Sequence, residues 1–286
     1  MNLFLVLALV LIQTVVGFAG PQPTHTHSYP ASAGLAGQPV GGPEEGPQKE
    51  EKWNNDKDFK ESDETQQTFE MAFGATVEIH SINGSVAIEP SVGNQAEVRI
   101  IRRARFREDL NFHKIKVENS NNTLKVYGEH TEGKSKEVRQ QIFVKIPRQM
   151  NLTVRAINGR VGVGELEGPV KISAVNGKVE LANITDTFET SSVNGNVVAT
   201  VRNLDAQGIK ISGINGKVEI RLADGLNANL NVNGINGNVR TDAPNITVEG
   251  KVSPSMFRAR LGNGGASITI SGVNGLVVFG SALPAK

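Results

Sequence analysis

Two glutamates are the strongest candidates for chemistry in this chain of 286 residues. Glu180 and Glu219 each lie four residues after the Asn of an Asn-Gly step. If the repeats around them stack at the spacing of paired strands, their carboxylates lie about 9–10 Å apart, which suits an inverting glycosidase. However, Val198 falls between them, and the repeats contain no Trp or Tyr on which a sugar could stack. We therefore predict surface charges and no catalytic residues; a carbohydrate-active enzyme of β-helix type, a lyase or hydrolase, is the alternative.

A cluster of arginines is the second candidate site. It could bind an anionic glycan, an envelope polymer or a lipid headgroup, and would then make the protein an envelope sensor. The other interpretation is the solvent face of a strand, with Val98 and Ile100 turned inward and Glu108 and Asp109 as counter-charges. We favour this second interpretation. Nucleic-acid binding would require interleaved aromatic residues, and only Phe106 is nearby. The cluster consists of Arg99, Arg102, Arg103, Arg105 and Arg107.

Metal and nucleophile chemistry have little support in the sequence. The chain has no cysteine, which excludes disulfides, thiolate metal sites and a cysteine nucleophile. His25 and His27 could bind a metal only weakly, because they lie in a stretch that we expect to be disordered. His80 and His113 are isolated, and no Ser lies at a readable spacing from a His base. We predict no metal and no cofactor.

One short phrase recurs seven times: a small residue, Ile or Val, Asn, Gly, any residue, then Val. The first three Asn of the run after residue 151 are 18 apart, the next two intervals are 21, and the last is 38. We interpret the interval of 38 as two units, the first of which has lost its Asn-Gly. Such periods are typical of stacked arrays. The seven pairs are Asn83-Gly84, Asn158-Gly159, Asn176-Gly177, Asn194-Gly195, Asn215-Gly216, Asn236-Gly237 and Asn274-Gly275.

Asn-Gly between apolar runs is also a strong signal for a β-hairpin. In a two-residue hairpin the flanking residues share a face, which would set the apolar residue before each Asn against Arg160, Lys178 or another polar residue. The alternation also slips by one at the small residue that precedes this apolar position. We therefore predict corners between strands that share an interior, with the Asn side chains hydrogen-bonded from repeat to repeat. The expected fold is all-β, a β-solenoid; a β-roll or meander of hairpins is the alternative.

The composition divides the chain into five parts. Residues 1–19 read as a signal peptide, because an apolar run from Leu3 to Val16 precedes a small-x-small site ending at Ala19. Residues 20–65 are rich in Pro, Gly and charge and are expected to form a disordered linker. Residues 66–150 form an N-terminal β-strand region, 151–281 the repeats and 282–286 a tail. We expect an exported protein without an integral membrane domain once the signal is cleaved. Lys and Arg number 30 against 29 Asp and Glu, so no global field attracts nucleic acid.

At this point the chain resembles a known group. The export signal, the strand-rich part that ends in VKIPRQMNLTV and the repeats that close with GNGGASITISGVNGLVVF are similar to bacterial β-strand-repeat domains of unknown function, often labelled adhesin or "head GIN" domains. The resemblance covers about residues 66–281. It implies a right-handed β-solenoid, usually exported, without catalytic residues to carry over. We therefore predict a non-enzymatic, structural or adhesin-like module of the cell envelope, with an envelope or extracellular polymer or protein as partner.

Overall fold

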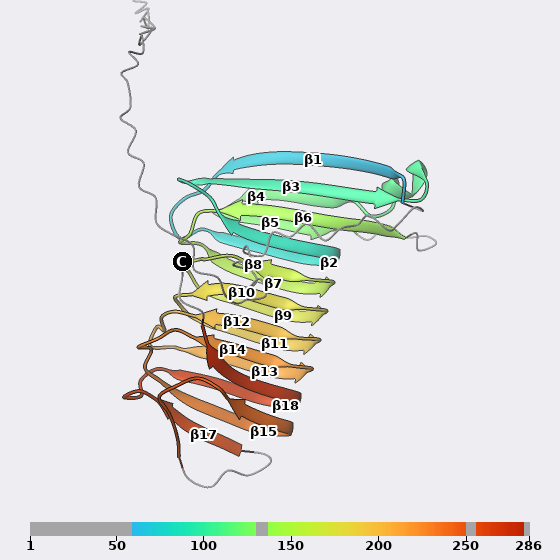
Figure 1. Ribbon diagram of the computed structural model, residues 1–286. Coiled ribbons are helices and arrows are strands. Elements are labelled where there is room, and N and C mark those ends of the chain that lie inside the picture. Colours follow the sequence, from blue (N-terminus) through green and yellow to red (C-terminus); the bar gives the residue numbers. More distant parts are fainter. Residues whose placement is uncertain (1–58, 130–136, 250–255, 283–286) are drawn as a thin grey trace, which may run out of the picture. The chain divides into compact units, whose positions relative to one another are not determined.

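The computed structural model describes residues 59–129, 137–249 and 256–282 (Figure 1). The signal peptide, His25, His27 and most of the expected linker therefore lie outside the described residues. The first strand begins at Glu61 rather than near Gln66. One short 3-10 helix, η1 (Arg107–Asn111), is the helical element of the described part. No helix in the described ranges is long and apolar enough to cross a membrane.

The N-terminal strands alternate buried and exposed residues along long runs. They are β1 (Glu61–Glu70), β2 (Thr76–Pro90), β3 (Gln95–Ala104), β4 (Ile115–Ser120), β5 (Thr123–Gly128) and β6 (Val138–Ile146).

The Asn-Gly region consists mostly of shorter strands, followed by a hairpin and one last long strand. They are β7 (Asn151–Asn158), β8 (Val161–Val163), β9 (Val170–Asn176), β10 (Val179–Ile184), β11 (Phe188–Asn194), β12 (Val197–Val201), β13 (Ile209–Asn215), β14 (Val218–Leu222), β15 (Ala228–Thr241), β16 (Ile246–Val248), β17 (Met256–Leu261) and β18 (Ser267–Ser281).

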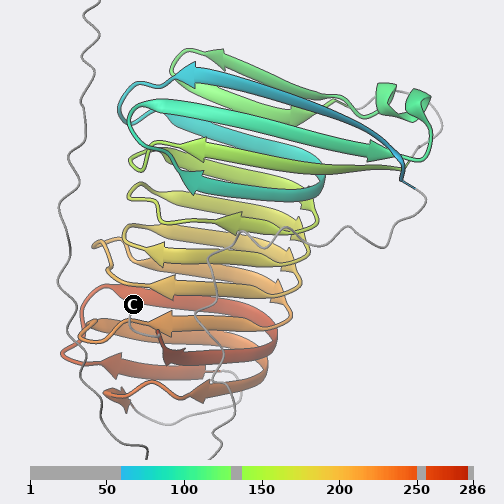
Figure 2. The same cartoon turned by 45° about the horizontal axis from the view of Figure 1, so that its top comes forward.

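Ten of these strands form a closed ring of parallel pairings. Starting from β2, one side of the ring runs through β7, β9, β11 and β13 to β18. The other side returns from β18 through β14, β12, β10 and β8 to β2. The ring closes because β2 and β18 each continue past their Asn-Gly step and pair on both sides (Figures 1 and 2).

The predicted right-handed β-solenoid is therefore wrong, and so is the alternative β-roll or meander of hairpins. The fold is all-β, as expected, but it is a closed parallel β-barrel of ten strands with the other strands outside it. The repeat pattern describes each Asn-Gly unit by itself. It does not reveal that two strands at the ends of the array are long enough to join its two sides into one ring.

The Asn-Gly steps lie where the chain turns from one side of the ring to the other. The residue two places before each Asn has a left-handed backbone in six copies: Ala156, Ala174, Ser192, Gly213, Gly234 and Gly272, with φ between 53° and 62°. This conformation strains a bulky residue more than a small one. It explains why the position is always small and why the alternation slips there, since the left-handed residue turns the next side chain back toward the interior.

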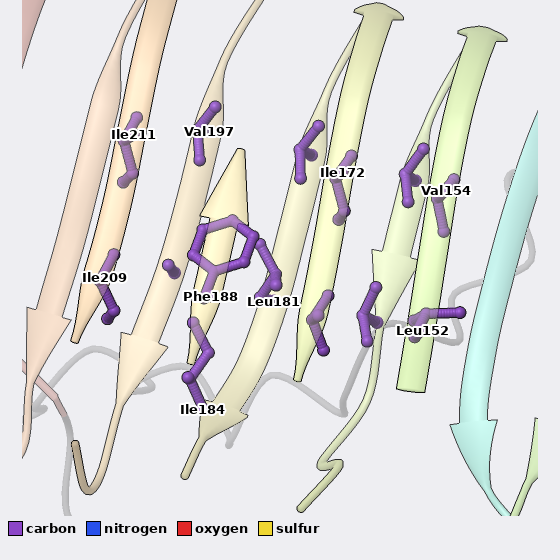
Figure 3. Close-up of a cluster of buried hydrophobic side chains, with 14 of the residues drawn as sticks. Leu152, Val154, Ile172, Leu181, Ile184, Phe188, Val197, Ile209 and Ile211 are labelled. Carbon is purple, nitrogen blue, oxygen red and sulfur yellow. The ribbon is translucent and has the colours of Figure 1, made fainter. Parts of the chain in front are cut away.

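The interior of the ring is filled with aliphatic side chains and two phenylalanines. Figure 3 shows Leu152 and Val154 on β7, Ile172 on the neighbouring β9 and Phe188 further along the same layer. Phe188 and Phe279 are fully buried. Thr190 is the exception in this layer, because it is completely buried and its hydroxyl has no hydrogen-bond partner.

The strands outside the ring cover its two ends unequally. At the β2 end, β5 pairs with the first half of β2 and β6 with the second half. The antiparallel strands β3 and β1 then extend the sheet from β6 (Figure 1). At the other end, β15 pairs with β18 along its length, and β17 pairs with residues 228–233 of β15 only. The interval of 38 residues is thus no pair of repeats, because it contains the antiparallel hairpin of β16 and β17.

Candidate functional site

Seven asparagine side chains form one continuous column, six of them on strands of the ring and the seventh on β15 beside it. Six hydrogen bonds of 3.1–3.2 Å join them, and in each the Nδ2 of one Asn donates to the Oδ1 of the Asn on the adjacent strand nearer β2. We call this column the amide ladder. Its spatial order is Asn83, Asn158, Asn176, Asn194, Asn215, Asn274 and Asn236.

The glycine after each Asn is required by a close approach of two backbones. Each has φ between 145° and 155°. At six of the seven Asn-Gly steps, all except the first, a Cβ on the glycine would overlap the carbonyl oxygen of the equivalent glycine on the neighbouring strand. At Gly195 this is the oxygen of Gly177. In Gly84 it would overlap the oxygen of Gln140 instead. The Gly N–H groups donate along the same column, as from Gly177 to the Asn194 carbonyl at 2.9 Å.

A row of serines lies beside the amide ladder on the outside of the ring. Ser173, Ser191, Ser212 and Ser271 occupy the same register position on four neighbouring strands. They are half-buried, and they alternate with the inward-facing residues before them. Neighbouring strands lie about 4.8 Å apart, so the hydroxyls repeat at that interval. With the small residues and the amide ladder next to them, they form a flat polar strip that we call the serine face.

The two glutamates that carried the enzyme hypothesis are both bound to cations. Glu180 contacts Lys178, and its Oε2 lies 3.5 Å from Arg160 Nε. Glu219 lies 2.7 Å from Lys217 Nζ and 2.8 Å from Arg221 Nε. Hydrogen bonds from Lys217 and then Arg221 lower the pKa of Glu219 below its usual value. A lowered pKa is opposite to what a general acid requires.

Four of the five predicted arginines contact an acidic side chain or a backbone carbonyl. The Arg102 side chain is 15% exposed; it pairs with Asp63 at 2.9 and 2.5 Å and donates to the carbonyls of Leu110 and His113 at 2.8 and 2.9 Å. It therefore ties β1 and the η1 segment to β3. Arg99 pairs with Glu64 on β1 at 2.7 Å, while Arg105 lies 3.8 Å from Glu137. Arg107 donates to the Ser62 carbonyl and Arg103 lies opposite Ser62 in the register.

The histidines of the described residues do not form a metal site. His80 stacks on Tyr127 with the ring centroids 5.3 Å apart. Burial, and next the charge of Arg155, lower the pKa of His80 below its usual value. The carbonyl of His113 accepts hydrogen bonds from Arg102 and Gln140. No group of three or more His, Asp or Glu in the described ranges is placed to hold a metal ion.

A hollow of about 260 Å³ lies at the Asn83 end of the amide ladder. The sequence did not predict it, because its walls come from segments that are far apart in the chain. Asn83, Ser85 and Arg160 come from two Asn-Gly steps, Glu137 directly precedes β6, and Arg139 lies at the start of β6. The one available signal was that Asn83 is the first copy of the repeat, so that its amide has a neighbour on one side only.

The comparisons with known proteins found structural neighbours only. No protein-family model and no curated protein matches the chain. A candidate cell adhesion protein from Clostridium sporogenes ATCC 15579 aligns with 78% of this chain and 100% of its own, at 11% identity and a TM-score of 0.38. A candidate adhesin from Parabacteroides distasonis ATCC 8503 aligns over 76% and 97%, at 12% identity and a TM-score of 0.31.

A third neighbour, a candidate lipid-binding protein from the same Parabacteroides strain, aligns over 77% and 95% at 11% identity, with a TM-score of 0.27. The neighbours thus include adhesin-type proteins, the class that the repeats resemble, while no match supports a "head GIN" membership. At such low identity and TM-score, a function for this chain must be argued from its own residues.

Proposed function

We propose that the chain is a non-enzymatic binding module, adhesin-like, that acts outside the cytoplasm at the cell envelope. The serine face is the observation that carries this proposal. It offers hydroxyls, amides and very small side chains in register on adjacent strands. Such a strip can lie flat against an extended partner and repeat the same weak contact at each strand.

The rigidity of the serine face supports a binding role. The strands β9, β11 and β13 are each paired on both sides, and the amide ladder locks their turns. A surface that is already ordered loses little conformational entropy when a partner binds. Several weak contacts on one rigid strip also act together, because the first contact raises the effective concentration for the others.

The surroundings of Glu180 and Glu219 do not favour a catalytic role. Glu180 and Glu219 already have cationic partners, and the lowered pKa of Glu219 keeps it ionised near neutral pH. The export of the module rests on the apolar N-terminal run and on its resemblance to exported domains.

The proposal can be tested with an array of envelope polysaccharides and extracellular proteins. Ser191→Arg places a long charged side chain in the middle of the serine face. Thr200→Arg is the matched control, since Thr200 is an outward, half-buried residue of β12, the next strand in the sequence, which lies on the other side of the ring. We expect a partner that binds the wild type and Thr200→Arg but not Ser191→Arg. A partner that binds all three equally would refute the serine face, and new reducing ends or unsaturated products would refute the non-enzymatic assignment.

A further inference from the structure

The second half of β15 is the last of the parallel strands in space. Residues 228–233 of β15 pair with β17 on one side, and β18 lies along the other side. Residues 235–241 pair with β18 and, on the side away from β18, with no strand of the described residues. We call residues 235–241 the open edge. An unpaired strand edge presents a row of backbone N–H and C=O groups with which another strand can pair.

The backbone groups left unpaired at the open edge follow from the strands before it. In four consecutive turns of the ring, the N–H of the ladder glycine donates to a carbonyl on the next strand away from β2, as from Gly216 to Asn274 at 3.0 Å. The N–H of the valine two places later does the same, as that of Val197 does at 2.8 Å. On β15 the equivalent N–H groups belong to Gly237 and Val239, and by this geometry they point away from β18.

The exposure of the open edge also distinguishes it from the other Asn-Gly steps. Gly237 is exposed, whereas the glycines of the other six steps are half-buried. Val239 is half-buried, whereas the equivalent valine is buried at the other six steps, as Val218 is. Asn236 donates to Asn274, and its own Oδ1 accepts no hydrogen bond from a described residue. One more strand would therefore cover an apolar side chain and supply a donor to the last amide of the ladder.

The shape of the open edge restricts which strand can pair with it. At Gly237 the carbonyl oxygen of Gly275 occupies the place where a Cβ would lie. By the same geometry, the Gly237 carbonyl occupies the Cβ position of a parallel strand laid in register outside it, so that strand must have glycine there. An Asn before this glycine would donate to Asn236, and a valine two places after it would pack beside Val239.

The charge of the open edge adds a further preference. Arg240 lies three places after Gly237, is exposed, and has no ion-pair partner among the described residues. Its neighbour in register on β18 is Val278. Residues in register on adjacent strands lie about 4.8 Å apart, so a carboxylate at this position of an added strand would reach the guanidinium group.

We propose that the open edge binds an extended segment of another polypeptide, which pairs parallel with β15 and contains Asn-Gly-x-Val followed by an acidic residue. A folded second copy cannot supply this segment, because each of its Asn-Gly steps already faces a neighbouring strand on the required side. Strand β1, at the far end of its sheet, contains no glycine. The open edge is separate from the serine face and stands whether or not the serine face binds a partner.

The test uses the full chain and a fluorescent peptide, GINGKVEIR, which copies residues 213–221 and has the required pattern. Binding is measured by fluorescence anisotropy at low ionic strength, and the backbone amide signals of the 15N-labelled chain locate the site. We expect saturable binding, with the largest shifts at Gly237 and Val239. A scrambled peptide of the same composition should not bind.

Three changes in the peptide test the selection without altering the fold of the chain. Gly216→Ala places a Cβ against the Gly237 carbonyl and should weaken binding about tenfold or more. Asn215→Ala loses one hydrogen bond to the amide ladder and should weaken binding about two- to tenfold. Glu219→Lys brings like charges together at Arg240 and should weaken binding about two- to fivefold, an effect that added salt reduces.

A charge exchange links the peptide to one residue of the chain. Arg240→Glu in the chain should weaken binding of the original peptide, and the Glu219→Lys peptide should restore it. Arg258→Glu is the matched control, because Arg258 is an exposed arginine of β17, which pairs with the other half of β15. This control and Ser191→Arg on the serine face should both leave the affinity unchanged.

Each contrary result overturns a particular part of the proposal. Absence of saturable binding, equal binding of the scrambled or Gly216→Ala peptide, or shifts centred on β1 would overturn the open edge as the site. Failure of the charge exchange to restore binding would overturn the parallel register. If the Gly237 and Val239 signals shift as the concentration of the chain alone rises, a second copy occupies the edge, and a different polypeptide as partner is overturned.

Discussion

The N-terminal strands and the Asn-Gly strands hold their neighbours in two different ways. In the N-terminal part, the antiparallel strands β1 and β3 are joined by ion pairs between particular residues, such as Arg102 with Asp63 and Arg99 with Glu64. In the Asn-Gly part, parallel strands repeat one side-chain hydrogen bond at the same place on every strand. The first arrangement depends on a few individual residues, and the second on the regularity of a column.

The largest effect should come from breaking the close approach within the column. Gly195→Ala would press a Cβ into the Gly177 carbonyl, so we expect the free energy of unfolding to fall by about 3 kcal/mol or more. Gly213→Ala is the control: its φ of 62° is close to that of Ala156 and Ala174, and a Cβ would lie 3.4 Å from its nearest neighbour. Urea denaturation of both variants measures the difference. If both variants lost the same free energy of unfolding, the close approach of the Gly195 and Gly177 backbones would not explain why glycine is needed at Gly195.

A smaller loss is expected in the N-terminal part from Arg102→Ala. The Arg102 side chain is 15% exposed and joins Asp63 to two carbonyls, so its removal leaves a partly buried carboxylate and should cost about 2–3 kcal/mol. Arg99→Ala removes a pair that is 40% and 50% exposed and should cost less than Arg102→Ala, because exposed ion pairs contribute little to stability. The same denaturation experiment applies. Equal costs would mean that the contacts of Arg102 do not tie β1 and η1 together.

The loss of stability caused by an Asn→Ala substitution in the amide ladder should depend on the position of the Asn in the ladder. Asn194→Ala removes two side-chain hydrogen bonds, one given to Asn176 and one received from Asn215, and should cost about 1–2 kcal/mol. Asn236→Ala removes only the bond to Asn274 and should cost about half as much. Thermal unfolding followed by circular dichroism can rank the two variants. If Asn236→Ala were the more damaging, the ladder would not be the source of the stability.

The smallest expected effect is an increase in the free energy of unfolding. Thr190 pairs in register with Ile172 and Ile211, yet its buried hydroxyl has no partner. Thr190→Val keeps the shape and removes an unsatisfied polar group, so it should stabilise the fold by about 1 kcal/mol. Thr200→Val, on an outward position of β12, should change little. A loss of stability in Thr190→Val would indicate that the hydroxyl has a function in the interior.

The sequence predicted the local features of the Asn-Gly part well. The apolar residue before each Asn is buried in all seven copies, as at Val175, and the small residue before it marks a change of direction. The closure of the ring could not be predicted, since it depends on β2 continuing through Asn83-Gly84 while β7 ends at Asn158. These two steps are nearly identical in sequence, and only the neighbouring strands distinguish them.

The same limit applies to the candidate sites. The pairing of Arg102 with Asp63 joins residues of β3 and β1, and no local pattern predicts such a partner. The hollow at Asn83 also could not be found, because it requires the spatial order of the amide ladder. That order departs from the order of the chain at Asn274, which lies between Asn215 and Asn236.

This departure has a consequence for the newly made chain. β18 is the last strand in the sequence, but it lies between β13 and β14 on one side and β15 on the other. Until residues 267–281 join the sheet, the strand edges of β13, β14 and β15 that pair with β18 have no partner and are exposed to other chains. Closure of the ring therefore waits for β18, and a chaperone that shields unpaired strand edges would help most during that interval.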